Sequence, residues 1–553
     1  MKQAGSKNIF SYKYRLQRLK RDSNKWAILT LLILFIIVLP IVSIGVKLFS
    51  GPGETWGHIA DNLLLDYLGN SLFLIFACGA IVLLFGVSTA WLVARFEFPL
   101  RKQLEWLLIL PLAIPGYIVA YAYAGIFDYG GTLQLIMEAA GLEFVRFDIM
   151  NRSGLAFVLG ISLFPYVYVS SRAFFLNQAN NLMEASEMLG VGPVKTFFKL
   201  MLPMARPAIV AGLILVLMEV LNDYGAAKYF GVNTFTTGIF RSWFSLEEPE
   251  TAVYLSALLI VIVFSLILLE KFQRRKLRFS SNRDNNMRIN RKKVSSKMQL
   301  VIFLAVLLPV LLGFLIPVAQ LIYWATLTYE NVFNLSFLTI SVQSFGIALL
   351  TAFVSVVIAV ILIFFSKWSR LGFIKNIAKL GVLGYAIPGA VVAIGIMIPT
   401  IFIDRWLIDV MDYLFNMDVG LIFTGTLVAL IYAYVVRFLA VAYNPIESTA
   451  LKVSNAIPDS SNMLGVGNLR TFFKIEFPLI RTGIASAFIL VFVDVLKELP
   501  LTLILKPFHV NTLAVKAYEY ASDEMVMEAA IPSLFIIVTV MLPVIFLNRL
   551  LIK

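Results

Sequence analysis

Apolar runs long enough to cross a bilayer recur along the whole chain, and they restrict the fold more than any other feature of the sequence. A transmembrane helix needs about 20 consecutive apolar residues. About twelve runs meet this length, near residues 26–48, 70–94, 104–127, 153–176, 207–225, 251–270, 300–324, 343–365, 377–403, 420–443, 484–505 and 530–549. The sequence therefore predicts an all-α integral membrane protein, and residues 26–48 should remain as an uncleaved anchor.

Composition supports a membrane location, because 60% of the 553 residues are hydrophobic and only 14% are charged. Soluble proteins average roughly a quarter charged residues. The net charge of +13 comes from short basic clusters between the apolar runs, so we interpret it as an orientation signal and expect no nucleic-acid partner. The single cysteine, Cys78, excludes an intrachain disulfide or a metal cage built from thiolates.

A segment of 26 residues, 184–209, occurs a second time as residues 459–484, with 13 identical positions. We call these segments the first and second repeated loops. Both lie between apolar runs, after the fourth and the tenth. If the N-terminus is cytoplasmic, most Lys and Arg of the short loops lie inside, as the positive-inside rule requires. This orientation places both repeated loops and both termini in the cytoplasm.

The repeat extends to the whole chain and predicts two halves of six helices each. We divide the sequence into a basic N-terminal tail (1–25), a first transmembrane half (26–270), a basic linker (271–299) and a second transmembrane half (300–553). Six helices per half return the chain to the same side, so a pseudo-two-fold axis along the membrane normal should relate the halves. The linker should lie near anionic lipid in the cytoplasm.

Glycines are conserved between the two loops where a helix has to end. Gly190 and Gly465 follow a helical turn and suit the left-handed conformation that terminates a helix. Gly192 and Gly467 come two residues later, before a second short helix. Both loops should therefore be helix–turn–helix elements that rest on a surface or fill a partner's groove.

Prolines interrupt two predicted spans at matching positions. Ala113-Ile114-Pro115-Gly116 corresponds to Ala386-Ile387-Pro388-Gly389. Proline removes a backbone donor and displaces the carbonyl four residues earlier, which a bilayer tolerates only where protein or water covers the gap. Pro115 and Pro388 therefore indicate either packed kinks or bends that line a pathway.

Four acidic residues lie within predicted spans, again 275 residues apart: Glu219 and Asp223 match Asp494 and Glu498. A spacing of four places each pair on one helical face. Acids at membrane depth are costly unless they face a cavity or a partner, so they are candidates for a translocation pathway. Alternatively, they reach water at the helix ends, with Asp494 paired to Lys497. Tyrosines could add oxygen donors or act as interfacial anchors: Tyr117, Tyr121, Tyr123 and Tyr385.

No phosphate-binding loop, zinc-protease motif or nucleophile elbow occurs, and only two histidines are present, so we expect no catalysis and no cofactor in this chain. The first repeated loop resembles the EAA loop of type I ABC importer permeases: Glu184-Ala185-Ser186 is followed by Gly190 and by Leu202-Pro203. The second loop departs from this pattern, with Asp459-Ser460-Ser461, but keeps Gly465 and reads Phe477-Pro478.

This resemblance implies a fused permease in the bacterial inner membrane that works with two ATPase subunits and an extracytoplasmic binding protein. ATP and Mg²⁺ would be bound by the ATPase subunits, which would contact the loops at Glu184, Gly190, Gly192, Asp459, Gly465 and Gly467. The segments Gly231–Phe244 and Lys497–Phe508 are similar to fused permeases of ferric-iron importers.

The substrate implied by this similarity is ferric iron, with transient contacts at Glu219, Asp223, Asp494 and Glu498 but no fixed metal site. Relatives of that subgroup imply thiamine, aminoethylphosphonate or a polyamine as alternatives. A twelve-helix secondary transporter is the rival class, but residues 94–103 lack the charged loop motif expected of major-facilitator proteins.

Overall fold

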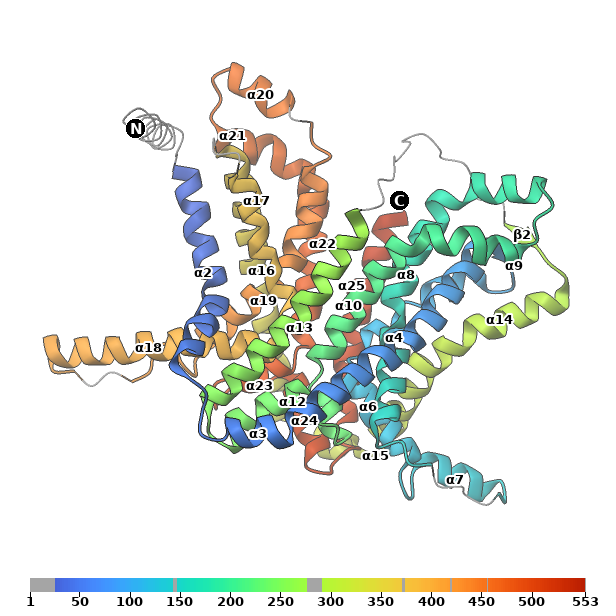
Figure 1. The fold of residues 1–553 in the computed structure, drawn as a ribbon, viewed down its shortest axis with the longest axis horizontal. Coiled ribbons are helices and arrows are strands. Elements are labelled where there is room, and N and C mark those ends of the chain that lie inside the picture. The colour runs from blue at the N-terminus through green and yellow to red at the C-terminus, as the bar shows by residue number, and fades with distance from the viewer. Residues whose placement is uncertain are drawn as a thin grey trace, which may run out of the picture. The chain divides into compact units, whose positions relative to one another are not determined.

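The computed structural model describes residues 25–142, 147–275, 291–369, 373–417, 420–454 and 456–552 (Figure 1). Most of the predicted N-terminal tail and much of the predicted linker therefore lie outside the described residues. The described chain is almost entirely helical. Its two-residue strands, β1 (Phe96–Glu97) and β2 (Lys292–Lys293), pair in parallel.

Ten helical segments of the described chain are long and apolar enough to cross a membrane. They are Lys25–Ser50, Leu64–Arg95, Arg152–Leu176, Pro193–Asn222, Pro249–Leu269, Ser296–Val332, Leu335–Trp368, Gly389–Phe415, Leu427–Ala450 and Asn468–Leu496. A further pair, Arg101–Ala113 with Gly116–Ala139, is bent by 94° and gives an eleventh span if counted as one. The last predicted run is α25 (Ala530–Ile552), whose described apolar part ends at Pro543.

These segments correspond to helices α2 (Lys25–Lys47), α4 (Leu64–Arg95), α8 (Arg152–Met188), α10 (Leu202–Asn222), α13 (Pro249–Arg275), α14 (Ser296–Val310), α15 (Ile316–Val332), α16 (Leu335–Trp368), α18 (Gly389–Phe415), α19 (Leu427–Ala450) and α22 (Phe477–Leu496). The bent pair contains α5 (Arg101–Leu107), η2 (Leu110–Ala113), α6 (Gly116–Phe127) and α7 (Thr132–Ala139). The all-α membrane fold predicted from the sequence is confirmed.

Shorter helices connect the long ones. In the first half they are η1 (Leu48–Ser50), α3 (Trp56–Asn62), α9 (Pro193–Thr196), η3 (Phe197–Met201), α11 (Gly225–Tyr229), α12 (Phe235–Phe240) and η4 (Arg241–Ser245). In the second half they are η5 (Leu311–Leu315), α17 (Ile374–Ala378), η6 (Lys379–Ala386), α20 (Ala456–Met463), α21 (Asn468–Thr471), η7 (Phe472–Glu476), α23 (Pro500–Leu505) and α24 (Leu513–Ser522).

The two prolines break their helices in the same way. Pro115 and Pro388 both have φ −54° and ψ 142°. The residues before them, Ile114 and Ile387, are extended, as the proline ring requires. Each proline follows a 3₁₀ segment and immediately precedes a helix. As a result α18 begins at Gly389, whereas the sequence predicted a span from about residue 377.

The chain forms two compact units that differ from the two sequence halves. Residues up to Phe49 belong with 341–511 and the last few residues, whereas residues 50–340 belong with 512–545. Within the first unit, Ser43 on α2 donates a hydrogen bond to the carbonyl of Gly395 on α18 at 2.6 Å. Each half therefore gives its first long helix to the unit built mainly from the other half.

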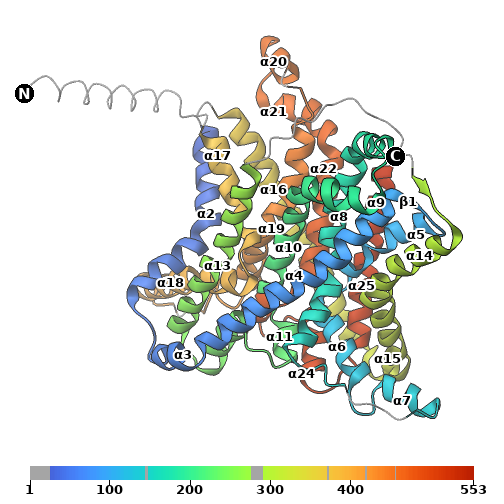
Figure 2. The same ribbon diagram turned by 45° about the vertical axis from the view of Figure 1, so that its right-hand side comes forward.

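The second unit contains α14 and α15, the helices that open the second half. Tyr123 on α6 donates a hydrogen bond to the carbonyl of Leu312, which lies between α14 and α15, at 2.7 Å. In the same unit α4, α8 and α10 pack side by side, as both ribbon views show (Figures 1 and 2). The first repeated loop joins α8 to α10, so both of its ends are held by packed helices.

Candidate functional site: the repeated loops and the buried acids

Both repeated loops begin with the same helix termination. Gly190 has φ 68° and Gly465 has φ 74°, so the left-handed turns predicted from the sequence are present in both copies. The next residue donates its N–H to the carbonyl five residues earlier: Val191 to Ser186 at 2.9 Å, and Val466 to Ser461 at 3.1 Å. This is the hydrogen bond of a Schellman motif.

Gly192 and Gly467 serve a different purpose. Both have extended backbones, with φ −65° and −68°, and each precedes the first residue of a short helix, α9 or α21. An extended backbone is open to other residues. The loop geometry therefore requires glycine at the first position of each Gly-Val-Gly sequence and not at the second.

A buried pair of hydroxyls ties the two ends of each loop together. Ser186 and Thr196 lie 3.1 Å apart between their side-chain oxygens, and Ser461 and Thr471 lie 2.6 Å apart. All four residues are buried. The sequence analysis did not assign them a role, although each pair is identical in both copies and is separated by ten residues.

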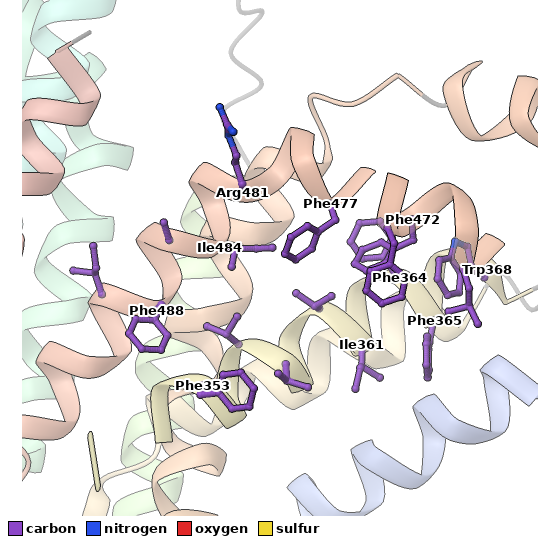
Figure 3. A pocket seen from close by; sticks show the side chains of 17 residues that line it. Phe353, Ile361, Phe364, Phe365, Trp368, Phe472, Phe477, Arg481, Ile484 and Phe488 are labelled. Carbon is purple, nitrogen blue, oxygen red and sulfur yellow. The ribbon is translucent and has the colours of Figure 1, made fainter. Parts of the chain in front are cut away.

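A π-helical turn follows in each loop and anchors it to a long helix. The first phenylalanine of η3, Phe197, packs on Trp91 of α4 with ring centroids 5.2 Å apart. In the second loop, Phe472 of η7 packs on Phe364 of α16 at 4.6 Å, as Figure 3 shows. A force on either loop would therefore act directly on the end of a membrane helix.

Two neighbouring apolar residues at the turn of each loop are exposed. Met188 and Leu189 are 89% and 80% exposed, and Met463 and Leu464 are 90% and 82% exposed. Asp459 is exposed on α20, whereas the side chain of Glu184 lies outside the described residues. Large apolar side chains in contact with water favour a protein partner, so the exposed Met-Leu pairs are candidate docking surfaces.

The second loop also borders an apolar groove within its own unit (Figure 3). The groove has a volume of about 770 Å³ and lies between α16 and α22. Residues that line it include Phe353, Phe364, Trp368, Phe472 and Phe488. Its walls belong to segments long enough to span a membrane, so acyl chains suit its surface chemistry.

The predicted acid pairs do not lie on continuous helical faces. α10 ends at Asn222 and α22 ends at Leu496, so Asp223 and Glu498 both fall just beyond the helix. In the second half the cause is Pro500, whose ring would clash with the carbonyl of Leu496. Gly225 occupies the matching position in the first half, where it begins α11. The prediction that the two acids of each pair lie on one face of a single helix is therefore wrong.

Asp223 stabilises the turn that follows α10. Its Oδ1 accepts hydrogen bonds from the backbone N–H groups of Ala226 and Ala227 at 3.0 and 3.1 Å. Its Oδ2 would lie 3.6 Å from a Cβ atom placed on Gly116, the first residue after the Pro115 break. Glu219 is half-buried one turn earlier on α10.

The equivalent acid in the second half, Glu498, is neutralised. Its Oε2 lies 3.3 Å from Nε of Arg437 on α19, and both residues are buried. Arg437 also donates to the carbonyl of Ile387, at the Pro388 break, at 3.1 Å. A Cβ atom on Gly389 would approach Glu498 Oε1 to 2.6 Å, so glycine makes room for this ion pair.

The remaining acid, Asp494, pairs with Lys497 at 2.9 Å, as one of the two sequence interpretations proposed. Asp494 and Glu498, the two acids of the second-half pair, therefore both have cationic partners. Ser162 stands at the position of Arg437 in the first half, 275 residues earlier. Among the described residues, no Lys or Arg pairs with Asp223, so the repeat has become electrostatically asymmetric.

Tyrosines gather near Asp223 in the same compact unit. Tyr117 and Tyr121 on α6 are buried, and the ring of Tyr121 lies 4.6 Å from that of Tyr229 on α11. The Tyr121 hydroxyl has no hydrogen-bond partner within the described part of the chain. The Tyr518 hydroxyl lies 3.3 Å from that of Tyr224. A carboxylate and several phenols thus provide oxygen donors in this compact unit.

Comparison with known proteins supports the class that this geometry suggests. Residues 82–278, which include the first repeated loop and its flanking helices, match the family described as binding-protein-dependent transport system inner membrane component. The chain is 26% identical over 490 residues to the Fe(3+)-transport system permease protein FbpB 2 of Haemophilus influenzae. That alignment covers 88% of this chain and 90% of the relative.

Sulfate permeases are also related. The chain is 26% identical over 207 residues to the sulfate transport system permease protein CysT of Escherichia coli, covering 37% of this chain and 72% of the relative. It is 26% identical over 195 residues to CysW of the same organism, covering 35% and 66%. The helical membrane fold, the two repeated loops and these relatives resemble type I ABC importer permeases, and the relatives are named as permease subunits of transport systems. Over most of its length the chain resembles the Fe(3+)-transport system permease.

Proposed function

We propose that this permease imports ferric iron, received from an extracytoplasmic binding protein. The observation that carries the proposal is the match to an Fe(3+) permease over 88% of this chain, whereas the sulfate permeases match 35% to 43% of it. The oxygen donors near the Pro115 break support it, because carboxylates and other oxygen donors suit hard cations better than thiolates do.

The acids guide the cation along its route, and their contributions are unequal. Among the described residues no Lys or Arg pairs with Asp223, whereas Lys497 and Arg437 pair with Asp494 and Glu498. A passing cation therefore interacts mainly with Asp223, together with phenols such as that of Tyr121. Weak, open contacts of this kind permit release, which a closed coordination cage would slow.

ATP hydrolysis reaches the membrane helices through the repeated loops, which face the cytoplasm together with both termini. Two ATPase subunits dock on the exposed Met-Leu tips, one at each loop. Movement of a subunit is transmitted through Phe197 to α4 and through Phe472 to α16. Gly190 and Gly465 hold the turns that present the tips.

Uptake by proteoliposomes tests the proposal. The permease, its ATPase and its binding protein are reconstituted together, and ATP-dependent accumulation of radioactive ferric iron, sulfate, thiamine and a polyamine is compared. We expect accumulation of iron only. Accumulation of sulfate, thiamine or a polyamine without iron would contradict the iron assignment and leave the importer class unchanged.

A further inference from the structure

A polar pocket with two basic side chains opens at the end of α10 opposite the first repeated loop. It has a volume of about 380 Å³, within the range of about 300–1,000 Å³ typical of small-molecule sites. α11, α12 and η4 form its walls, so it lies entirely within one compact unit. Lys228, Arg241, Asn233 and Thr237 supply its polar surface, and Tyr224, Phe240 and Phe244 supply its apolar surface.

Lys228 and Arg241 give this pocket a positive charge that no acid of its lining offsets. None of the lining residues is acidic, and neither cation forms an ion pair with a carboxylate in the described chain. Arg241 donates to Oδ1 of Asn233 at 3.4 Å, which holds the guanidinium beside the pocket. Two cations with a neighbouring amide form a donor set suited to a carboxylate or another oxyanion.

The walls of the pocket are fixed by hydrogen bonds. Asn70 on α4 donates to the carbonyl of Asn233 at 3.0 Å. The side chain of Thr234 caps the start of α12, and Thr236 donates to the carbonyl of Asp223 at 2.7 Å. Because donors on a rigid scaffold lose little entropy when they bind, this pocket is preorganised for a ligand.

The second half carries the same sequence pattern without the same charge. Val232-Asn233-Thr234 recurs as Val510-Asn511-Thr512, which aligns Lys228 with Lys506 and Arg241 with Glu519. Glu519 pairs with Lys516 at 3.6 Å. Only the first copy of the pattern therefore has two basic residues without an acid, so shared fold requirements do not explain them.

We propose that this pocket binds an oxyanion or carboxylate group at the extracytoplasmic face of the permease. That group comes from a small anion that accompanies the substrate or from an acidic side chain of the binding protein. The proposal does not depend on iron as the substrate, because anion binding is measured separately.

The first arm of the test measures the binding of small anions to the purified permease in nanodiscs. Citrate and sulfate are titrated by calorimetry at low ionic strength against wild type and the double variant Lys228→Gln/Arg241→Gln. The matched control is Lys506→Gln/Lys516→Gln, which removes the same charge from the second copy. A small-anion site predicts that binding weakens at least tenfold in the first double variant and is retained in the control.

The second arm measures stimulation of ATPase activity by the binding protein in the complete transporter. A site for a carboxylate of the binding protein predicts no calorimetric signal. It also predicts that the first double variant needs at least tenfold more binding protein for half-maximal stimulation. Arg241→Lys keeps the charge and should retain most of the effect, which separates loss of binding from misfolding. If the first double variant behaves like the control in both arms, the proposal is wrong.

Discussion

Neutralising Glu498 should destabilise the permease far more than neutralising Asp494, although the two acids are neighbours in sequence. Glu498 and Arg437 are 6% and 4% exposed, and their charged atoms lie 3.3 Å apart. Glu498→Gln keeps an oxygen that can accept the N–H of Leu501, so the variant mainly removes the charge. Breaking a buried ion pair from one side costs about 3–5 kcal/mol because the partner charge stays buried and unpaired.

Asp494→Asn is the matched control. Asp494 and Lys497 are 17% and 26% exposed in their side chains, so water can solvate Lys497 when its partner is lost. Pairs with such access contribute about 0–1 kcal/mol. The free energy of unfolding is measured by denaturant titration in detergent, with expression level as a second readout.

A double variant separates the ion pair from other effects of substitution. Arg437→Gln alone should cost about as much as Glu498→Gln, and the combination should cost at least about 2 kcal/mol less than the sum, as coupled neighbours do. Recovery should be incomplete, because Arg437 also donates to the carbonyl of Ile387. Additive losses, or equal losses for Asp494→Asn and Glu498→Gln, would refute the ion-pair argument.

Three further predictions concern the first-half acid and the second repeated loop. Asp223→Asn keeps the acceptor for Ala226 and Ala227 but removes the charge, so iron uptake by proteoliposomes should fall severalfold at unchanged stability; unchanged uptake would exclude Asp223 from the route. Gly465→Val places a side chain at φ 74°, which costs about 1–2 kcal/mol locally, and it should uncouple ATP turnover from uptake. Gly467→Val should be tolerated, because Gly467 has an extended backbone. Equal uptake by both variants would contradict the turn argument. Phe472→Ala should reduce coupling of ATP turnover to uptake, because it removes the contact with α16. Phe473→Ala is the control, since that side chain is 65% exposed. A larger loss of coupling in Phe473→Ala than in Phe472→Ala would contradict the role of the contact.

Local features of the loops could be predicted because the repeat exposes them. Gly190 and Gly465 recur in the same context, and only a left-handed turn explains a glycine there. Pro115 and Pro388 likewise predict breaks from the chemistry of their own residues. The π-helical turns are different, since no residue type specifically requires them.

Features that depend on distant contacts could not be derived. Hydropathy shows that α2 spans the membrane but not which helices it contacts, so its packing with the second half was not predicted. The neutralisation of Glu498 depends on Arg437, which is 61 residues away on another helix and has serine as its counterpart in the first half. Periodicity within α22 carries no information about that partner.

Site-specific crosslinking tests the central claim that both repeated loops contact the ATPase. The only native cysteine, Cys78, is buried, so cysteines introduced at the exposed tips by Met188→Cys and Met463→Cys should react with little background. In the assembled transporter, each variant should form a crosslink to an ATPase subunit, and a cysteine at Leu72, which is exposed on α4, should form none. If the intact complex forms no crosslink from either tip, the two loops are not the coupling sites.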